Sequence, residues 1–275
     1  MVACQQLQLN VRSMPWEQMR EIVLANPVRE EAAIEALNVL KEWDGYVTAD
    51  SAGAAVYELF VADLSIRVAK AKAPNSWATV VGGGESGELL EGSTFAVNRV
   101  KHLIRLLHSK PEGWFAEGWE RAIESSLAAA VQRLRKVSGP GPGFWNWGHL
   151  RPLVLAHPLL GKHKLMAKFF NIDPVPCGGD QNTINQAATG PLEVTEPTSF
   201  IPNLRTVFDT ADWSNSRFVL AGGQSGNPCS PHFDDLFPLW KKGEGVPIPF
   251  TRDETIRDAK TTIRLNPIRK INPES

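Results

Sequence analysis

Apolar residues recur every three or four positions through most of the first half of the chain, from Ser13 to Lys136. This spacing is typical of amphipathic helices that bury one face. The first helix has Ser13 as a candidate N-cap and Pro15 in its first turn, and Asn26-Pro27 interrupts it after Ala25. A longer helix is predicted from Ala52 to Lys72.

Four predicted helices follow the first one in this helical layer. The earliest of the four ends at Trp43-Asp44-Gly45, and the Ala52–Lys72 helix comes next. The residues assigned to the buried faces are, in order, Ala33, Leu37 and Leu40; Val56, Phe60, Leu64 and Val68; Val100, Leu103, Ile104 and Leu107; and Ile123, Leu127, Val131 and Leu134.

The pattern changes at Gly139-Pro140-Gly141-Pro142-Gly143, because alternating Gly and Pro sustain neither helix nor sheet. Beyond it, short β-rich pieces are separated by Pro, Gly, Asn and Asp. One more helix is expected from Pro231 to Lys241, followed by a strand-like tail from Lys260 to Leu265. The β-rich pieces are 153–155, 183–185, 205–208 and 217–220.

These patterns predict an α+β protein with a helical first half and a mixed, strand-rich second half. The expected parts are a helical layer over 1–137, a Gly/Pro linker over 138–146 and a strand-rich part over 147–275. With 275 residues, 43% hydrophobic and 21% charged, the chain is long enough for a sizeable core. No internal repeat or heptad pattern interrupts this organisation.

Charge and cysteine content exclude several functional classes. The formal net charge of -1 gives no electrostatic footprint for nucleic acid or an anionic membrane, so neither is expected as a partner. Cys4, Cys177 and Cys229 stand far apart, which indicates neither a zinc ribbon nor a disulfide framework. The first twenty residues lack the pattern of a secretory signal, and no uncharged run approaches the length of a membrane span.

The densest polar stretch is Ala221–Asp235. Within it, Gly223–Asn227 resembles the G-x-S-x-G nucleophile elbow, but Asn227 stands where the second Gly belongs and Pro228 opposes an immediate helix. A catalytic Ser225, with His232 and Asp234 as partners, is one interpretation. The other is a tight turn in which the glycines adopt backbone angles that other residues avoid.

The residues that follow admit two interpretations as well. His232, Asp234 and Asp235 could begin a metal site, provided that ligands come from elsewhere in the fold. Alternatively Ser230 caps a helix that starts at Pro231, with the aspartates in its first turn. The second interpretation accounts for every residue type without a ligand.

A second polar stretch runs from Gly178 to Asn185. If a strand follows the two glycines, the side chains of Asp180 and Asn182 share one face and could line or brace a substrate pocket. Buried hydrogen bonds that tie the loop backbone to a sheet are the alternative. The residues proposed as pocket or scaffold support are Asp180, Asn182, Asn185, Gln224, Ser225, His232 and Asp234.

Gly82–Gly87 invites comparison with a phosphate-binding loop, but no Lys-Ser or Lys-Thr pair follows at the required spacing. A connection between helices is the expected role. The histidines on the helix around Lys101 and those between Trp147 and Lys164 lack an identified partner group, so none is assigned to catalysis.

Several segments, in this order, resemble the penicillin acylase family. They are Trp43-Asp44-Gly45, Trp147-Gly148-His149-Leu150, His157-Pro158-Leu159, the stretch Gly178–Asn185, Asp212–Arg217 and the stretch Ala221–Asp235. The resemblance is strong from Trp145 to Phe250 and weaker before Val137. It implies the C-terminal part of the β-subunit of an N-terminal nucleophile hydrolase with an αββα fold.

The resemblance also implies a mechanism. In that family a precursor is cut internally, and the newly exposed Ser attacks an amide carbonyl with its own α-amine as base. An Asn side chain and backbone N–H groups hold the oxyanion. The chain begins with Met1, Val2 and Ala3, and exposing Cys4 as a nucleophile would require their removal. The resemblance therefore predicts no catalytic residue here, and no cofactor or metal, since the family's calcium ligands belong to another portion.

The expected function is amide hydrolysis on an N-acyl small molecule, with this chain inactive by itself. The expected partner is a missing N-terminal portion or a companion chain of the same enzyme. Because strands of both halves share a sheet in this family, unpaired strand edges and exposed apolar surface are expected here. The alternative is a non-enzymatic relic or binding module. Family members are usually periplasmic or extracellular, and the acyl group is left open between β-lactam side chains, acyl-homoserine lactones and other N-acyl compounds.

Overall fold

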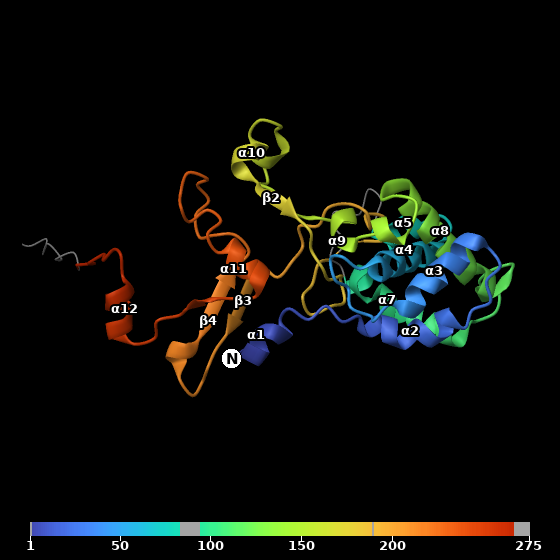
Figure 1. Ribbon diagram of the computed structural model, residues 1–275, viewed down its shortest axis with the longest axis horizontal. Coiled ribbons are helices and arrows are strands. Elements are labelled where there is room, and N and C mark those ends of the chain that lie inside the picture. Colours follow the sequence, from blue (N-terminus) through green and yellow to red (C-terminus); the bar gives the residue numbers. More distant parts are fainter. Residues whose placement is uncertain (1, 83–93, 189, 267–275) are drawn as a thin grey trace, which may run out of the picture.

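The computed structural model describes residues 2–82, 94–188 and 190–266. A helical body and a strand-rich part lie at opposite ends of an elongated molecule (Figure 1). The α-helices of the helical body and the segment before it are α1 (Val2–Leu7), α2 (Met14–Leu24), α3 (Glu31–Glu42), α4 (Ala52–Lys72), α5 (Trp77–Val80), α7 (Thr94–Ser109), α8 (Gly118–Val137) and α9 (Trp147–Leu150).

The five long helices lie where the apolar spacing predicts them. Ser13 caps α2 by accepting a hydrogen bond from the N–H of Trp16, and Pro15 stands in its first turn. Helix α4 has the predicted bounds, with Ser51 as its N-cap. It packs against α3, α7 and α8 and is buried on nearly all sides, so its apolar residues form no single stripe. Helix α4 is therefore the centre of the helical body.

An aromatic cluster closes one end of this body. The ring centroids of Trp16, Trp43 and Tyr57 lie 5.2 to 5.7 Å apart, and all three side chains are buried. Trp43 donates from its indole N–H to Tyr46 O at 2.9 Å, and Gly45 takes a positive φ of 84°. The Trp-Asp-Gly segment thus forms a tight turn after α3, and this turn packs the Trp43 side chain against α4 at Gly53.

The Gly-Pro segment ends the helical pattern as expected, with a 3₁₀ turn at Pro142–Phe144. The apolar core nevertheless continues past it, because Trp145 and Trp147 are fully buried among the helices. The division into parts at 138–146 stays a prediction.

The strand-rich part contains two small antiparallel sheets. Its elements are β1 (Leu153–Leu155), the 3₁₀ turn Leu160–Lys162, α10 (Ala167–Phe170), β2 (Ile172–Val175), β3 (Leu204–Val207), the 3₁₀ turn Trp213–Asn215, β4 (Arg217–Leu220), α11 (Phe237–Lys242), β5 (Val246–Pro247) and α12 (Arg252–Asp258). Strand β1 pairs with β2, and the other sheet has the order β3-β4-β5. A second, smaller core joins β1, β4 and α11 through Leu153, Val219 and Trp240.

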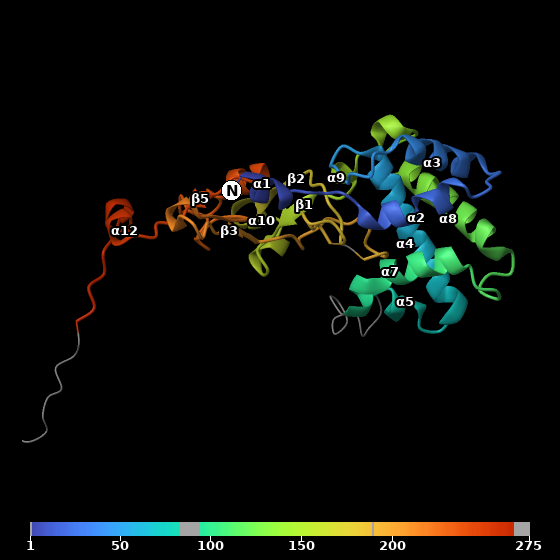
Figure 2. The ribbon, with the colours of Figure 1, turned by 90° about the horizontal axis from the view of Figure 1, so that it is seen from below.

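The sheet of three strands has a well-defined register, with Arg205 opposite Val219 and Thr206 opposite Phe218. Helix α12 lies at the far end of this part, and Figure 2 shows it well separated from the helical body. Among the described residues, no helix combines the length and the apolar character needed to cross a lipid bilayer.

Three sequence predictions were wrong. Residues 183–185 form turns, because the side chains of Asp180 and Thr183 bond to the local backbone in place of a strand partner. The helix expected from Pro231 begins only at Phe237, and 260–265 form no strand. Strands β2 and β5 were missed, since each is short and contains a proline. The Gly82–Gly87 loop lies almost entirely outside the described residues.

We expect Gly53→Ala to destabilise the helical body despite the helix propensity that Ala gains. A Cβ at this position would lie under 3.0 Å from ring carbons of Trp43, and the other two rings of the aromatic cluster prevent that ring from moving away. Overpacking of this kind costs about 1–3 kcal/mol. Urea unfolding followed by tryptophan fluorescence measures the loss. The control is Gly141→Ala, where nothing lies within 4 Å, and equal stability of the two variants would contradict the packing argument.

The buried carboxylate of Glu124 makes stability depend on pH. Glu124 accepts hydrogen bonds from the backbone N–H groups of Arg29 and Glu30 and pairs with Arg121, and these interactions lower its pKa to about 2. Its contribution is therefore complete above the ordinary glutamate pKa and is lost as the pH falls toward 2.

We expect the unfolding midpoint of the wild type to fall more steeply between pH 5 and about pH 2 than that of Glu124→Gln. Circular dichroism across this range gives the comparison. Glu117→Gln is the matched control at the N-cap of the same helix, because the Glu117 side chain is exposed and pairs with Arg121 at 3.4 Å. A pH profile unchanged by Glu124→Gln would show that this carboxylate is not the group responsible.

Candidate functional site

The loop from Cys177 to Ala188 runs between the helical body and the strand-rich part. Gly179 N–H donates to Val47 O at 2.7 Å, and the indole N–H of Trp147 donates to Gly179 O at 2.9 Å. Gly179 has a φ of 89°, and a Cβ there would lie under 3.0 Å from Asn185 O. Only glycine permits this backbone conformation and this close approach together.

Asp180 fixes the shape of this loop. Its side chain is fully buried, and Oδ1 accepts hydrogen bonds from the N–H groups of Asn182 at 2.6 Å and Thr183 at 2.8 Å. The Thr183 hydroxyl accepts a hydrogen bond from Asp180 N–H at 2.9 Å. Asn182 points to solvent, so Asp180 and Asn182 do not share a face as the sequence suggested.

Two buried arginines hold the loop from opposite sides. Arg151, which follows α9, donates from Nη1 to Ala187 O at 2.8 Å and from Nη2 to Ala188 O. Its guanidinium lies 5.6 Å from the ring centroid of Trp147. Desolvation lowers the pKa of Arg151 to about 10, so the group still carries its charge at neutral pH.

Arg205 approaches from β3. Its Nη2 donates to Asn185 Oδ1 at 2.7 Å and its Nη1 to Trp240 O at 2.6 Å, while the guanidinium stacks 4.1 Å from the Trp240 ring centroid. Desolvation lowers its pKa to about 10 as well. Asn185, a proposed support residue, is therefore the contact through which β3 and α11 reach the loop.

The sequence interpretation missed both arginines. A signal existed for Arg205, because in the predicted strand 205–208 it faces the side opposite to Thr206. A charged residue at an inward strand position indicates a buried hydrogen-bonding role. For Arg151 the only signal was its place directly after the Trp147–Leu150 segment.

The stretch from Ala221 to Leu236 leaves β4 and returns as a closed loop. Ser225 N–H donates to His232 O at 2.9 Å, and Leu236 N–H donates to Gly222 O at 2.9 Å. Gly222 has a φ of 150°, and a Cβ at Gly223 would lie under 3.0 Å from His232 O. The two glycines therefore permit the outgoing and returning segments of the loop to approach each other.

The polar residues of this loop do not form a serine triad. The Ser225 hydroxyl accepts a hydrogen bond from Asn227 N–H at 3.1 Å, and the contact between Ser225 and His232 is made by their backbones. The His232 ring pairs through Nδ1 with Asp235 Oδ2 at 2.8 Å, whereas Asp234 was the expected partner. Gln224, His232 and Asp234 are exposed.

The expected helix cap at Ser230 is absent from this loop. The Ser230 hydroxyl accepts from His232 N–H at 3.1 Å, two residues ahead, which forms a turn in place of a helix start. Helix α11 begins at Phe237, seven residues after Ser230, with Pro238 in its first turn. Within the described ranges 2–82, 94–188 and 190–266, no group of three or more His, Cys, Asp or Glu side chains could hold a metal ion.

A cleft of about 520 Å³ separates this loop from α10 and β2. Phe169, Phe170 and Phe233 line it together with Cys229 and Asp234. Phe169 projects into solvent with 68% of its surface exposed. Asp234 is the proposed support residue that this cleft contains, while Asp180 and Asn185 lie in the loop held by the arginines.

The penicillin amidase family model matches residues 1–257. The penicillin acylase 2 proenzyme of Pseudomonas sp. (strain SE83) is 32% identical over 157 residues, which are 57% of this chain and 19% of that protein. The acyl-homoserine lactone acylase QuiP of Pseudomonas aeruginosa is 27% identical over 256 residues, covering 84% of this chain and 29% of the relative. The chain thus spans less than a third of the length of these relatives.

A solved structure supports the fold. The thermostable penicillin G acylase from Alcaligenes faecalis superposes with a TM-score of 0.51 and 16% identity, over 94% of this chain and 47% of that one. This match confirms the predicted α+β fold of the penicillin acylase type. The penicillin amidase family model covers residues 1–257, which is nearly the whole chain, and this chain therefore belongs to the penicillin amidase family.

Proposed function

We propose that this chain is the supporting, C-terminal part of an amide-cleaving hydrolase whose nucleophile lies on another stretch of polypeptide. The observation that carries the proposal is the set of hydrogen bonds made by the polar residues of the stretches Gly178–Asn185 and Ala221–Asp235. Asp180, Ser225 and Ser230 accept hydrogen bonds from neighbouring backbone N–H groups, and the His232 ring pairs with Asp235. Such contacts shape loops and do not activate a nucleophile.

The proposed reaction is hydrolysis of the C–N bond of an N-acyl compound. Membership in the penicillin amidase family supports this class, as do relatives named for acylase activity on penicillin and on acyl-homoserine lactones. The two kinds of relative differ in substrate, so the proposal extends to the acyl amide and not to a particular acyl group. Any metal that the enzyme uses is assigned to the other portion.

The proposed partner is that other portion, either as a companion chain or as part of a longer polypeptide. Strand β3 has β4 on one side and ends its sheet among the described residues. In this strand and directly after it, Leu204 and Phe208 each expose more than half of their surface. Open edges and apolar patches of this kind are the usual mark of an interaction surface.

We expect purified 1–275, with nothing added, to give no release of 4-nitroaniline from N-acyl-4-nitroanilides above the uncatalysed rate. The partner in the second arm is the penicillin acylase 2 proenzyme of strain SE83 from which the region matching this chain has been deleted. Turnover that needs both polypeptides supports the proposal. Robust turnover by the chain alone overturns it, and binding without turnover favours a non-enzymatic binding module.

Ser225→Ala separates this proposal from a self-contained serine hydrolase. Because the Ser225 hydroxyl bonds to the backbone of Asn227, its loss leaves the turnover of the two-polypeptide mixture within about twofold of the wild type. A catalytic serine would lose several orders of magnitude. The initial rate with the same N-acyl-4-nitroanilide decides between them.

The glycines of the loop Ala221–Leu236 give a further prediction. Gly223→Ala places a Cβ against the carbonyl of His232 and opens the loop, whereas Gly226→Ala meets nothing within 4 Å. We expect faster hydrogen exchange of the Ser225 and Leu236 amides in the first variant only, and a lower yield of active two-polypeptide mixture. Equal exchange rates in both variants would show that the loop does not depend on this close approach.

A further inference from the structure

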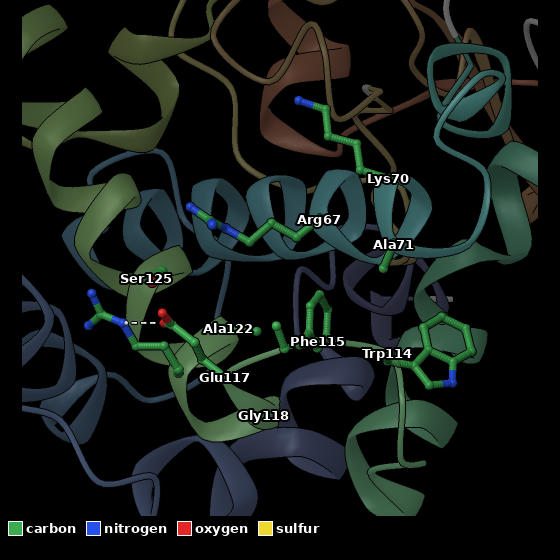
Figure 3. A pocket seen from close by; sticks show the side chains of 11 residues that line it. Arg67, Lys70, Ala71, Trp114, Phe115, Glu117, Gly118, Ala122 and Ser125 are labelled. Carbon is green, nitrogen blue, oxygen red and sulfur yellow. Dashed lines mark ion pairs between the residues drawn. The ribbon is translucent and has the colours of Figure 1, made fainter.

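A second cavity, of about 480 Å³, lies in the helical body between the C-terminal half of α4 and the start of α8 (Figure 3). This volume is within the range of about 300–1,000 Å³ typical of small-molecule pockets. Small residues, Ala71, Ala122 and Ser125, form part of its lining. They leave room for a flat group between the helices.

Aromatic rings form one wall of this cavity. Trp114 and Phe115 precede α8, and both pack on Trp119, with centroid distances of 5.9 and 4.8 Å. The Phe115–Trp119 pair is edge-to-face, a favourable geometry that restricts ring rotation. Gly118, with a φ of 81°, turns the chain from this wall into α8. The apolar wall is therefore held in place by the fold.

Arginine side chains stand on two sides of the same cavity. Arg67 from α4 donates from Nε to Asp63, and its terminal nitrogens carry further N–H donors. Figure 3 shows the Arg67 side chain running along α4 toward the side where Ser125 lies. Arg121 from α8 pairs with Glu30 and Glu124, and more distantly, at 3.4 Å, with the exposed Glu117. A third cation, Lys70, also lines the cavity, and its ammonium group lies 4.3 Å from the Trp77 ring centroid.

We propose that this cavity binds a small aromatic carboxylate. The ring would lie against Trp114 and Phe115, and the carboxylate would accept hydrogen bonds from the terminal nitrogens of Arg67. Arg121 would add a second contact when Glu117 is displaced, because Glu117 is its most weakly held partner. The proposal rests on this cavity alone and is independent of the chemistry proposed for the strand-rich part.

The probe is 2-naphthoate, and its uncharged analogue is 2-naphthylmethanol. Binding to the full chain is followed by ligand-observed NMR and by quenching of tryptophan fluorescence. If the charge selects the ligand, the alcohol binds about tenfold more weakly or worse. Equal binding of the two compounds, or no binding of 2-naphthoate at about 1 mM, would overturn the proposal.

The chain offers a closely matched pair of arginine variants. Arg67 and Arg135 are similarly exposed, at 39% and 41%, and each has one carboxylate partner. We expect Arg67→Gln to weaken 2-naphthoate binding about five- to tenfold and Arg135→Gln to leave it unchanged. Equal effects of the two variants would mean that general charge, and not this cavity, attracts the probe.

Two further variants test the cavity without removing an arginine. Ser125→Phe fills the hollow and should abolish binding, while Glu117→Gln releases Arg121 from a competing carboxylate and should tighten binding. Circular dichroism spectra establish whether each variant is folded. A tightening caused by Glu117→Gln cannot come from misfolding, and its absence together with full binding by Ser125→Phe would rule the site out.

Discussion

The interaction on which the arrangement of the two parts depends is the capture of one loop by two buried guanidinium groups. Arg151 holds the carbonyls of Ala187 and Ala188, and Arg205 holds the side chain of Asn185 together with the carbonyl of Trp240. Burying a guanidinium costs several kcal/mol, which these hydrogen bonds and the stacking on Trp147 and Trp240 offset. Loss of Arg151 would remove the donor to the buried carbonyl of Ala187, and loss of Arg205 would remove the donor to Asn185 Oδ1. Each unpaired acceptor costs about 1–3 kcal/mol. The loop is thus the joint between helices and sheet, and its geometry is set by hydrogen bonds more than by apolar packing.

This constraint explains why the family motifs contain so many polar residues and glycines. Trp147 reaches Gly179 with its indole N–H, Gly179 reaches Val47, and Asp180 closes the turn that presents Asn185 to Arg205. Apart from the local turn at Asp180, each step joins segments that are far apart in sequence. A dense polar motif can therefore be an architectural device, in which side chains replace the backbone partners that an irregular loop lacks. The stretch Ala221–Asp235 follows the same rule, with Gly222 and Gly223 permitting two passes of the chain to approach.

The sequence predicted the helices well because their stability is encoded locally and repeatedly. Helix α4 carries an apolar residue at almost every turn together with a Ser N-cap, and so its bounds were predicted correctly. The region 183–185 has the composition of a strand, but the Asp180 and Thr183 side chains compete for the backbone, a contact that alternation alone does not reveal. Likewise Ser230-Pro231 satisfies the local rules of a helix start, but the hydrogen bond from Ser225 N–H to His232 O across the loop holds this segment in another conformation. For the site, Asn185 was proposed as a support residue, whereas the arginine that holds it was not named, because the pairing spans 20 residues.

The two ends of the molecule also differ in how completely they bury their large apolar side chains. The helical body buries its large aromatic residues, including Trp16, Trp145 and Trp147, almost fully. The strand-rich part leaves Leu159, Phe169, Phe208 and Phe250 more than half exposed. In its described residues, the two sheets have only two and three strands. Sheets of this size need a covered face for independent stability. Since fold and chemistry are separable properties of a protein, a part can be kept for its geometry while the reacting groups are supplied elsewhere. The unequal burial agrees with the division proposed for this chain, because the open surface is then the one on which the proposed reacting portion would be positioned.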